Sequence, residues 1–293
     1  MKKITILMST YNGSRFLDRQ MESICSQKGL EDHEIKLVIR DDGSSDNTPD
    51  ILLSWKDRAD MDLIEGVNKG ARDSFLELLM NAPESDYYAF CDQDDIWYDD
   101  KLSKAVMSLS ESPRLYFSNV EYIDENGDKT SETLLSEDFE LSLKRVMMCN
   151  PANGCTMVWN DAMQRIVRGL DPEFYTMHDE FMLTSAMLFG SVVYDPQPSM
   201  GYRIHALNVT QSKGILKKLK MSSSIWFGRK QWSIDKRAAE LLGHELRDED
   251  RQIITELATY RKLFNRFRLI GKYRCEHAGI QRSFRLRMLL GVL

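Results

Sequence analysis

The sequence predicts an α/β fold in which helices flank a parallel sheet. Strand, polar turn and helix follow one another repeatedly over the first 110 residues. Parallel strands need connections of this kind, because the chain must cross back over the sheet between them. Hydrophobic residues make up 42% of the chain and charged residues 29%, as in ordinary soluble globular proteins. The 293 residues suffice for one large domain with an appendage, or for two modest domains.

Four pairs of a strand and a helix account for the N-terminal part of this prediction. An apolar run predicts each strand, and apolar residues at helical spacing, such as Leu17, Met21 and Ile24, predict the helices. Thr48 is the expected N-cap of the second helix, with Pro49 at the first helical position. The predicted strands are residues 4–9, 35–40, 61–65 and 88–91, and the predicted helices are residues 16–26, 49–55, 71–80 and 100–110.

The pattern is less regular after residue 112. Predicted strands follow at residues 115–122, 155–159 and 191–194, and predicted helices at residues 141–148 and 178–189. The composition changes near Gln211, and the remainder of the chain has helical patterning. We therefore predict a first domain of residues 1–212 and a basic helical C-terminal extension of residues 213–293.

The end of this extension is strongly basic. Between Arg261 and Arg287 there are nine Lys or Arg residues and one acid, Glu276, interleaved with apolar residues. Such a segment favours contact with an anionic membrane surface. It could also be a helical appendage with a solvated face, or an interface with a partner subunit or a second copy of the chain. The net charge of −6 gives the whole protein no general attraction for nucleic acid.

Two further observations indicate where the protein acts. No run of about 20 apolar residues, the length that spans a bilayer, is present in the sequence. The five cysteines contain no C-x-x-C pair, which argues against a disulfide framework and a structural zinc site. We expect a cytoplasmic protein, peripheral to the inner face of the plasma membrane if residues 261–287 bind lipid.

An acidic cluster ends the fourth predicted strand. Asp92, Asp94 and Asp95 come directly after the apolar residues 88–91. Side chains alternate along a strand, so Asp92 and Asp94 can point the same way, as a hard divalent cation with oxygen ligands requires. The simpler explanation is a solvated acidic loop that begins a helix, with Asp99 or Asp100 as the N-cap.

Polar loops also end the first and second predicted strands. They are Ser9–Asn12 and Asp41–Gly43. Open sheets of this kind bind ligands at the carboxyl ends of their strands. We therefore expect these two loops and the acidic cluster to form one site.

Taken together, these motifs resemble the family 2 glycosyltransferases, and above all the rhamnosyltransferase-like branch of bacterial surface-polysaccharide synthesis. The resemblance covers roughly residues 3 to 210 in order. It implies a GT-A fold with a mixed, mostly parallel sheet, a nucleotide-sugar donor, an Mn²⁺ or Mg²⁺ ion, and inverting transfer. The motifs are Ser9-Thr-Tyr-Asn-Gly13, Asp41-Asp-Gly-Ser44, Asn68-x-Gly70, Asp92-Gln-Asp-Asp-Ile-Trp97 with Lys101-Leu102, His178-Asp179 and Tyr202-Arg-x-His205.

The resemblance also assigns the donor side of a site. Tyr11 is suited to stack on a pyrimidine ring, and the Asp41 carboxylate is suited to accept the ring N–H. Without a ligand, ordinary packing would explain Tyr11 and an Asx-turn would explain Asp41. A lone histidine is also often structural. The residues implied are Ser9, Tyr11, Asp41 and Arg72 for the base, Asp92 for the ribose, Asp94 for the metal ion, and His205 for the ion or the diphosphate.

The same likeness assigns a catalytic base on the acceptor side. In inverting transfer a carboxylate takes the proton of the attacking hydroxyl, and Asp179 matches the family's position for it. Glu180 is the second candidate. Two residues depart from the branch: Glu180-Phe181 replaces a Trp pair, and Asp73 stands where Asn is common. The acceptor pocket is therefore expected to differ.

We predict transfer of rhamnose from dTDP-rhamnose, with a UDP-hexose as the second choice of donor, to a glycan or lipid-linked acceptor. One rival is a nucleotidyltransferase, which would hold a triphosphate on a Gly-rich basic loop. Ser9–Ser14 has one Gly and no Lys. Two weaker rivals are a phosphatase with an aspartyl nucleophile and a catalytically inactive subunit that binds a nucleotide-sugar.

Overall fold

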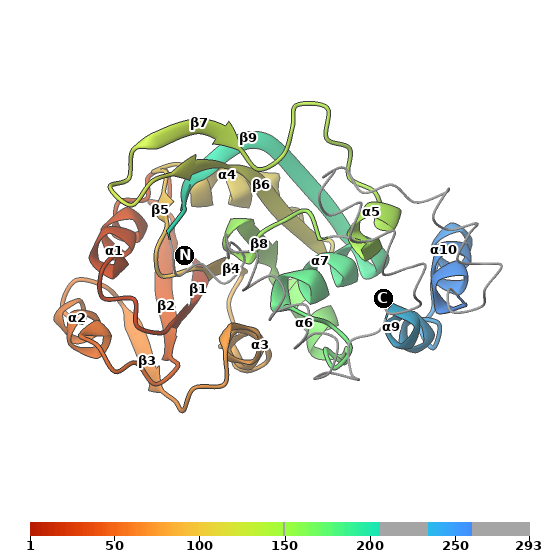
Figure 1. Ribbon diagram of the computed structural model, residues 1–293, viewed down its shortest axis with the longest axis horizontal. Helices are drawn as coiled ribbons and strands as arrows, with labels where there is room; N and C mark the ends of the chain where they lie inside the picture. Colours follow the sequence, from red (N-terminus) through yellow and green to blue (C-terminus); the bar gives the residue numbers. More distant parts are fainter. Residues whose placement is uncertain (149, 206–233, 260–293) are drawn as a thin grey trace, which may run out of the picture.

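The computed structural model describes residues 1–148, 150–205 and 234–259. Within them, nine strands form one sheet in the order β3-β2-β1-β4-β8-β6-β9-β5, and β7 pairs with β6 (Figure 1). The strands are β1 (Lys2–Thr10), β2 (His33–Asp41), β3 (Met61–Glu65), β4 (Tyr87–Cys91), β5 (Ile96–Trp97), β6 (Arg114–Ile123), β7 (Lys129–Thr133), β8 (Met157–Asn160) and β9 (Ser191–Arg203). The helices are α1 (Leu17–Cys25), α2 (Thr48–Ser54), α3 (Ala71–Asn81), α4 (Lys101–Ser108), α5 (Leu143–Met148), the 3₁₀ helix η1 (Gly154–Thr156), α6 (Asp161–Arg168), α7 (His178–Phe189), α9 (Ile234–Leu241) and α10 (Asp248–Ala258).

The sheet is mixed and mostly parallel, as predicted. Strands β3, β2, β1 and β4 run parallel to one another. Strand β8 is antiparallel to both of its neighbours, β4 and β6, and β9 returns to run parallel to β6. The register between β1 and β2 ends with Thr10 opposite Asp41. The polar loops that follow these two strands therefore start from the same edge of the sheet.

Strand β4 lies in the middle of the sheet, and all five of its residues are buried. Tyr87, Ala89 and Cys91 pack in one core layer, and Tyr88 and Phe90 pack in the other. This alternation follows from the two-residue period of a strand. A strand that is buried on both faces has a continuous run of apolar residues in the sequence. This run allowed β4 to be predicted.

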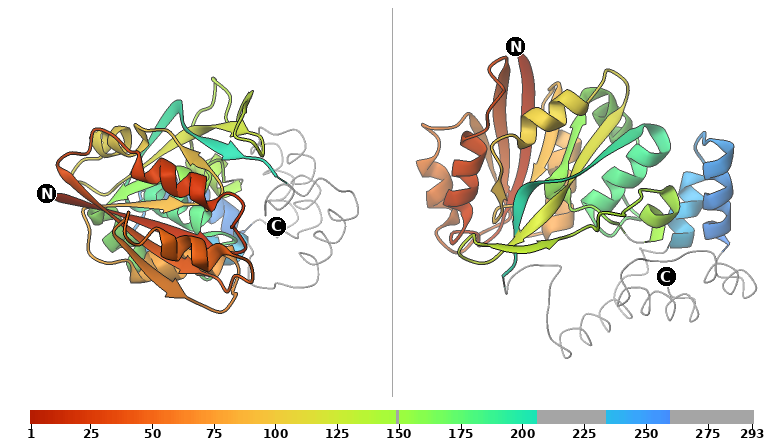
Figure 2. Two further views of the ribbon diagram at one scale, coloured as in Figure 1. Left: turned by 90° about the vertical axis from the view of Figure 1, so that its left-hand side faces the viewer. Right: turned by 90° about the horizontal axis from the view of Figure 1, so that it is seen from above.

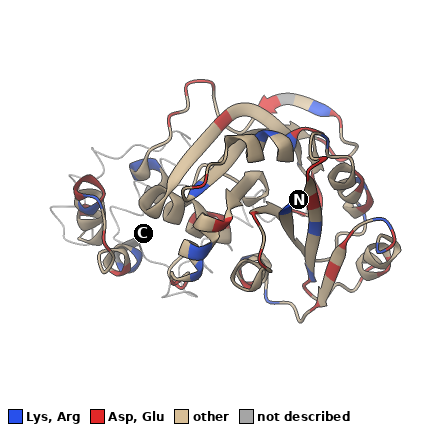
Figure 3. Ribbon diagram, turned by 180° about the vertical axis from the view of Figure 1, so that it is seen from behind, with Lys and Arg blue, Asp and Glu red and all other residues tan. Residues whose placement is uncertain are grey.

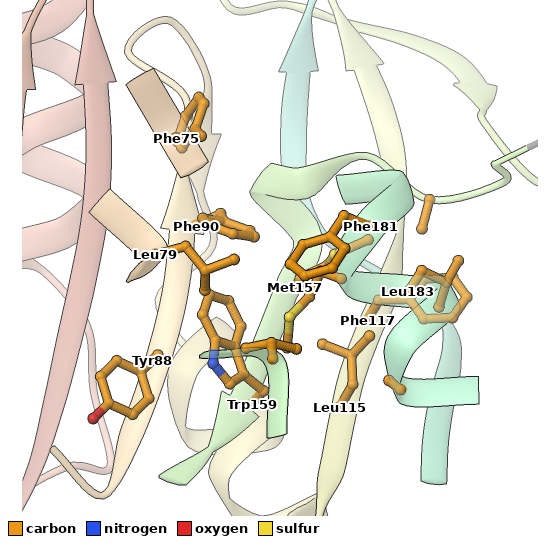
Figure 4. Close-up of a cluster of buried hydrophobic side chains, with 14 of the residues drawn as sticks. Phe75, Leu79, Tyr88, Phe90, Leu115, Phe117, Met157, Trp159, Phe181 and Leu183 are labelled. Atoms are coloured by element: carbon orange, nitrogen blue, oxygen red, sulfur yellow. The ribbon is translucent and has the colours of Figure 1, made fainter. Parts of the chain in front are cut away.

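The layer between the sheet and helices α3, α6 and α7 is rich in aromatic residues (Figure 4). The Phe90 ring lies 4.6 Å from that of Trp159 and 5.5 Å from that of Phe75, measured between centroids. Trp159 Nε1 donates to Gln164 Oε1 (2.7 Å), so the indole N–H is satisfied inside the core. This packing places α3 and α7 beside the end of β4, where the acidic cluster begins.

Several elements were not predicted. Strand β5 has two residues, too few to show a period, and β7 is a short polar strand at the edge of β6. Helix α6 begins after Asn160, whose side chain accepts a hydrogen bond from Met163 N (3.0 Å). The predicted strand at 191–194 is instead the start of one long strand, β9. Its Pro198 is tolerated because the register with β6 shifts there.

Helices α9 and α10 lie at the end of the molecule opposite α1 and α2 (Figures 1 and 2). They form a third apolar cluster with α5 and the end of α7. Its members are Leu143, Met147, Leu188, Ala238, Leu241, Leu246, Ile254 and Leu257. The predicted boundary at 212/213 and the basic segment 261–287 lie outside the described residues.

Charged residues of both signs are interspersed on the outer helices at both ends of the molecule (Figure 3). Within the described part of the chain, no helix has both the length and the apolar character needed to cross a bilayer.

Candidate active site

The three loops predicted to form one site do lie together, at the ends of β1, β2 and β4. Tyr11 N donates to Gln93 Oε1 (2.8 Å), and Gln93 Nε2 donates back to Tyr11 O (3.1 Å). Asn12 N donates to Ser44 Oγ (2.9 Å), and Ser45 N donates to Asn12 Oδ1 (2.8 Å). The loop after β1 is therefore hydrogen-bonded to both of the other loops.

Gly13 is required for this arrangement. A Cβ atom at this position would lie 2.1 Å from Gln93 Oε1, and Gly13 N donates to Thr48 Oγ1 (2.8 Å). Its neighbour Asn12 has a φ of 48°, a left-handed conformation that Asn tolerates better than most residues. Gln93, which the sequence analysis did not single out, is thus the clamp between two of the loops.

Asp41 and Asp42, at the end of β2, both accept hydrogen bonds from neighbouring loops. The Asp41 carboxylate is 4% exposed and accepts hydrogen bonds from Thr10 Oγ1 (2.9 Å), Ser44 N (2.8 Å) and Ser44 Oγ (2.6 Å). Asp42 forms a buried ion pair with Arg40 and accepts hydrogen bonds from the backbone before α3. The turn considered for Asp41 is present, since the carboxylate accepts from Ser44 N and Ser44 Oγ. Contact between Asp41 and a nucleotide base stays a prediction.

The other residues assigned to the base occupy the same edge of the sheet. The Tyr11 side chain is 48% exposed. Ser9 Oγ lies 2.7 Å from Ser74 Oγ on α3. Arg72 Nε donates to Tyr175 O (2.8 Å), so Arg72 connects α3 to the segment before α7. Contact of Ser9 or Arg72 with a base stays a prediction.

Asp94 and His205 meet although 111 residues separate them in the sequence. His205 Nε2 lies 2.7 Å from Asp94 Oδ2, and the two side chains are 7% and 17% exposed. Neighbouring ligands of an Mg²⁺ or Mn²⁺ ion with bonds near 2.1 Å lie about 3 Å apart. A carboxylate oxygen and an imidazole nitrogen also suit such an ion. The pair therefore fits the predicted metal site.

Arg203, which the sequence analysis did not assign, holds this pair in place. Its backbone N donates to Asp95 Oδ1 (3.0 Å) and its Nε donates to Asp94 O (2.7 Å). Its Nη1 donates to the carbonyl oxygens of Asp124 (2.9 Å) and Glu125 (3.0 Å) in the turn between β6 and β7. Arg203 thus connects the acidic loop to the end of β9, which carries His205.

A second group of ligand atoms lies beside the first. Oxygens of Asp92 and Asp95 and the Cys155 sulfur lie within 4.8 Å of one another. Burial raises the pKa of the Cys155 thiol well above its usual value, and a protonated thiol is a poor metal ligand. Burial and the nearby Asp94 charge raise the pKa of Asp92 to about 7. The Asp94–His205 pair and this group are thus two neighbouring candidate cation sites.

Asp179 stands at the first turn of α7 and faces this acidic loop. Burial raises its pKa to about 7. Hydrogen bonds from the Glu180 and Gly154 backbone and from the Asn150 side chain act in the opposite direction and lower this pKa. The Asp179 charge in turn contributes to the raised pKa of Asp92. A carboxylate that titrates near neutral pH is suited to general base catalysis.

Glu180 has a different environment. Its Oε2 accepts hydrogen bonds from Thr176 N (2.9 Å) and Thr176 Oγ1 (2.6 Å), and its Oε1 is ion-paired with Arg237 of α9. The Arg237 charge and these hydrogen bonds keep the pKa of Glu180 below its usual value despite burial. The two neighbouring carboxylates therefore differ: the pKa of Asp179 is raised by burial, and that of Glu180 is lowered by its charged and hydrogen-bonding partners.

His178 packs beneath the candidate base. Its ring stacks on Phe75 with centroids 4.1 Å apart, and burial lowers its pKa to about 3, so it is neutral. A Cβ at Gly154 would lie 2.5 Å from His178 Nε2 and 3.4 Å from Asp179 Cβ. Gly154 thus permits close packing of η1 against the start of α7.

Comparisons with known proteins agree with this geometry. The model of a family described as "Glycosyl transferase family 2" matches residues 5–182, more than half of the chain. The chain belongs to glycosyl transferase family 2. It is therefore a glycosyltransferase, and its sequence is similar to that of dTDP-rhamnosyl transferase RfbG of Shigella flexneri, with 31% identity over 223 residues that make up 69% of this chain and 72% of that protein.

Solved structures of glycosyltransferases share the fold. TarS 1–349 of S. aureus, in complex with UDP-GlcNAc, has a TM-score of 0.60 at 15% identity, covering 98% of this chain and 81% of that chain. Mannosyltransferase PcManGT from Pyrobaculum calidifontis, in complex with GDP-Man and Mn²⁺, has a TM-score of 0.53 at 14% identity, covering 97% and 74%. The fold is thus the predicted GT-A fold.

Proposed function

We propose that this glycosyltransferase transfers a sugar with inversion and depends on a divalent cation. Rhamnose from dTDP-rhamnose is the favoured donor sugar, a UDP-hexose is the second choice, and the acceptor is a hydroxyl of a glycan or lipid-linked glycan. The observation that supports the proposal is that the ends of β1, β2 and β4, the residues after β9 and the start of α7 bring the Asp94–His205 pair and the Asp179 carboxylate, with its raised pKa, to the same side of the sheet.

On the donor side, the exposed Tyr11 ring would stack on the pyrimidine, with Ser9, Asp41 and Arg72 near its edge and Asp92 near the ribose. The name of the Shigella relative supports dTDP-rhamnose, and the UDP-GlcNAc complex of TarS supports a uridine nucleotide as the second choice. Thymine and uracil present the same hydrogen-bonding edge and differ by one methyl group. The donor therefore has to be identified by assay.

Asp94 and His205 would hold the Mn²⁺ or Mg²⁺ ion. When bound, the ion would neutralise charge on the departing diphosphate. The Mn²⁺ in the PcManGT complex supports manganese as the first ion to test. Arg203 would keep the two ligands adjacent, because it bonds to the Asp94 carbonyl and lies two residues before His205.

On the acceptor side, Asp179 would take the proton of the attacking hydroxyl. The bond between the acceptor oxygen and the anomeric carbon forms as the bond to the diphosphate breaks on the opposite face of the sugar. Burial of Asp179 and the neighbouring Glu180 charge raise its pKa to about 7, so the group accepts a proton readily at neutral pH.

A donor panel tests the proposal. Purified protein is incubated with dTDP-rhamnose, UDP-glucose, UDP-GlcNAc and GDP-mannose, with Mn²⁺, Mg²⁺ or EDTA, and release of nucleoside diphosphate is measured. We expect release from one pyrimidine nucleotide-sugar, lost in EDTA. Undiminished release in EDTA would contradict the metal dependence, and turnover of GDP-mannose alone would contradict the choice of donor.

A further inference from the structure

Arg237 is a deeply buried contact between α9 and the candidate active site. Its side chain is 6% exposed. Nη1 is ion-paired with Glu180, Nη2 donates to Met147 O (2.9 Å), and the guanidinium lies 5.2 Å from the Tyr175 ring centroid. One residue of the C-terminal helices therefore contacts α5, the segment before α7, and the first turn of α7.

Both oxygens of the Glu180 carboxylate have partners. One oxygen pairs with Arg237 and the other accepts two hydrogen bonds from Thr176. Its neighbour Asp179 accepts a hydrogen bond from Glu180 N (2.7 Å). Movement of Glu180 would therefore move the backbone group that orients Asp179, and a released Glu180 would add a second carboxylate at the first turn of α7.

Other ion pairs of the same helical unit differ from this one. Arg247 pairs with Asp250 three residues away at 2.6 Å, and the Arg247 side chain is 59% exposed. The Asp250 side chain is 5% exposed, so loss of either arginine leaves a buried carboxylate without its charged partner; Arg237 pairs with the first turn of α7, whereas Arg247 pairs with a residue of α10. Arg247 thus provides a matched control for Arg237.

We infer that Arg237 is a positioning residue for sugar transfer: by holding Glu180, it orients Asp179 toward the acceptor and makes α9 part of the acceptor side of the site. This inference rests on the proposed function, because it requires Asp179 to be the base. The extension is then more than an appendage that stabilises the fold or binds another surface.

The test uses the full chain with Arg237→Met, Glu180→Gln, the double variant and Arg247→Met as the control. The kcat and KM for transfer are measured with the donor from the panel, together with donor hydrolysis. We expect Arg237→Met to lower kcat for transfer about a hundredfold, the scale of a misplaced catalytic group. Donor KM and donor hydrolysis stay unchanged, and Arg247→Met behaves as wild type.

The double variant shows whether Arg237 acts through Glu180. If Arg237 acts through Glu180, its loss has no further effect once Glu180 is changed, so we expect the double variant to transfer sugar at the rate of Glu180→Gln alone. If Arg237→Met does not fold, the double variant, which has no unpaired buried ion, still provides the test. Wild-type kcat in folded Arg237→Met, or a double variant slowed by the product of the two single effects, would overturn the inference.

Urea unfolding of these proteins, of the wild type and of an Arg247→Met/Glu180→Gln double variant completes two double-mutant cycles, a readout that does not depend on activity. We expect clear coupling between Arg237 and Glu180, and no coupling between Arg247 and Glu180. Coupling of zero for the first pair overturns the inference even when transfer is established. Absence of transfer by the wild type with every donor refutes the proposed function instead, and these two failures are distinguishable.

Discussion

The proposed donor and acceptor sides of the site are built in different ways. On the donor side, three loops that directly follow β1, β2 and β4 are hydrogen-bonded to one another through Tyr11, Asn12 and Gln93. On the acceptor side, Asp179 depends on η1, on the start of α7 and, through Glu180, on α9. The first side is formed by contiguous motifs, and the second is assembled from distant parts of the chain.

This difference indicates how each side will tolerate change. The loops after β1, β2 and β4 are fixed by the strands that they follow and by hydrogen bonds to one another, so substitution of an exposed side chain such as Tyr11 should leave their backbone in place. The acceptor side depends on packing between helices, so its geometry can change when a remote contact changes.

The largest expected effect is the loss of transfer when the proposed base is replaced. Asp179→Asn should lower transfer by about a thousandfold, since removal of a general base typically costs 10²–10⁴ in rate. Glu180→Gln should lower transfer by no more than about a hundredfold, the loss expected for Arg237→Met, because the amide has one acceptor oxygen for the two partners Arg237 and Thr176. The measurement is the steady-state rate of product formation. Equal losses in the two variants would abolish the distinction between the two carboxylates.

A second large effect is expected on the donor side. Asp94→Ala should lower nucleoside diphosphate release by about a hundredfold or more and remove its response to Mn²⁺, because the ion loses its carboxylate ligand. Asp99→Ala is the matched control, since Asp99 belongs to the same acidic run but forms an exposed ion pair with Lys28. Unchanged stimulation by Mn²⁺ in Asp94→Ala would place the cation elsewhere.

A smaller effect should follow from loosening the clamp between two donor loops. Gly13→Ala forces Gln93 to move, because the new Cβ would overlap its amide oxygen. We expect donor KM to rise about tenfold while the acceptor KM stays constant, an effect of about 1.4 kcal/mol. Gly169→Ala, whose Cβ would meet only the Ile166 carbonyl at 3.4 Å, is the control. A change confined to acceptor KM would show that this loop belongs to the other side.

A pH response of the proposed acceptor side is expected as well. Asp179 must be ionised to take a proton, and its pKa is raised to about 7. Transfer should therefore rise as pH increases, by about tenfold per unit below pH 6, and level off above pH 8. The check is kcat for transfer between pH 5 and 9. A rate that is flat across neutral pH would indicate a base of ordinary acidity.

The same contrast explains what the sequence could predict. The strands β1, β2 and β4 and their loops are visible because each is a continuous apolar run followed by polar residues. The donor-side loops then meet because parallel strands end at one edge of the sheet. Strand β5 was not predicted because two residues are too few to show an alternating pattern. Helix α6 could have been predicted from Asn160, a typical N-cap residue whose side chain accepts a hydrogen bond from Met163 N.

On the proposed acceptor side, the resemblance suggested Asp179 as the base with Glu180 as the second candidate, and no local pattern separates the two residues. The separation comes from Arg237, 57 residues further along the chain, and from the burial of Asp179. Neither a contact across that distance nor a degree of burial follows from residue spacing. Arg203 was missed for a related reason, since its partners lie in the turn between β6 and β7 as well as in the acidic loop.

The most direct test of the account is calorimetric titration of Mn²⁺ into the protein saturated with dTDP or UDP. It compares wild type, Asp94→Ala and Asp179→Asn. The account predicts that wild type and Asp179→Asn bind the ion with the same Kd, and that Asp94→Ala does not bind it in the same range. Wild-type binding by Asp94→Ala, or loss of binding in Asp179→Asn, would contradict a site in which one carboxylate holds the cation and another serves as the base.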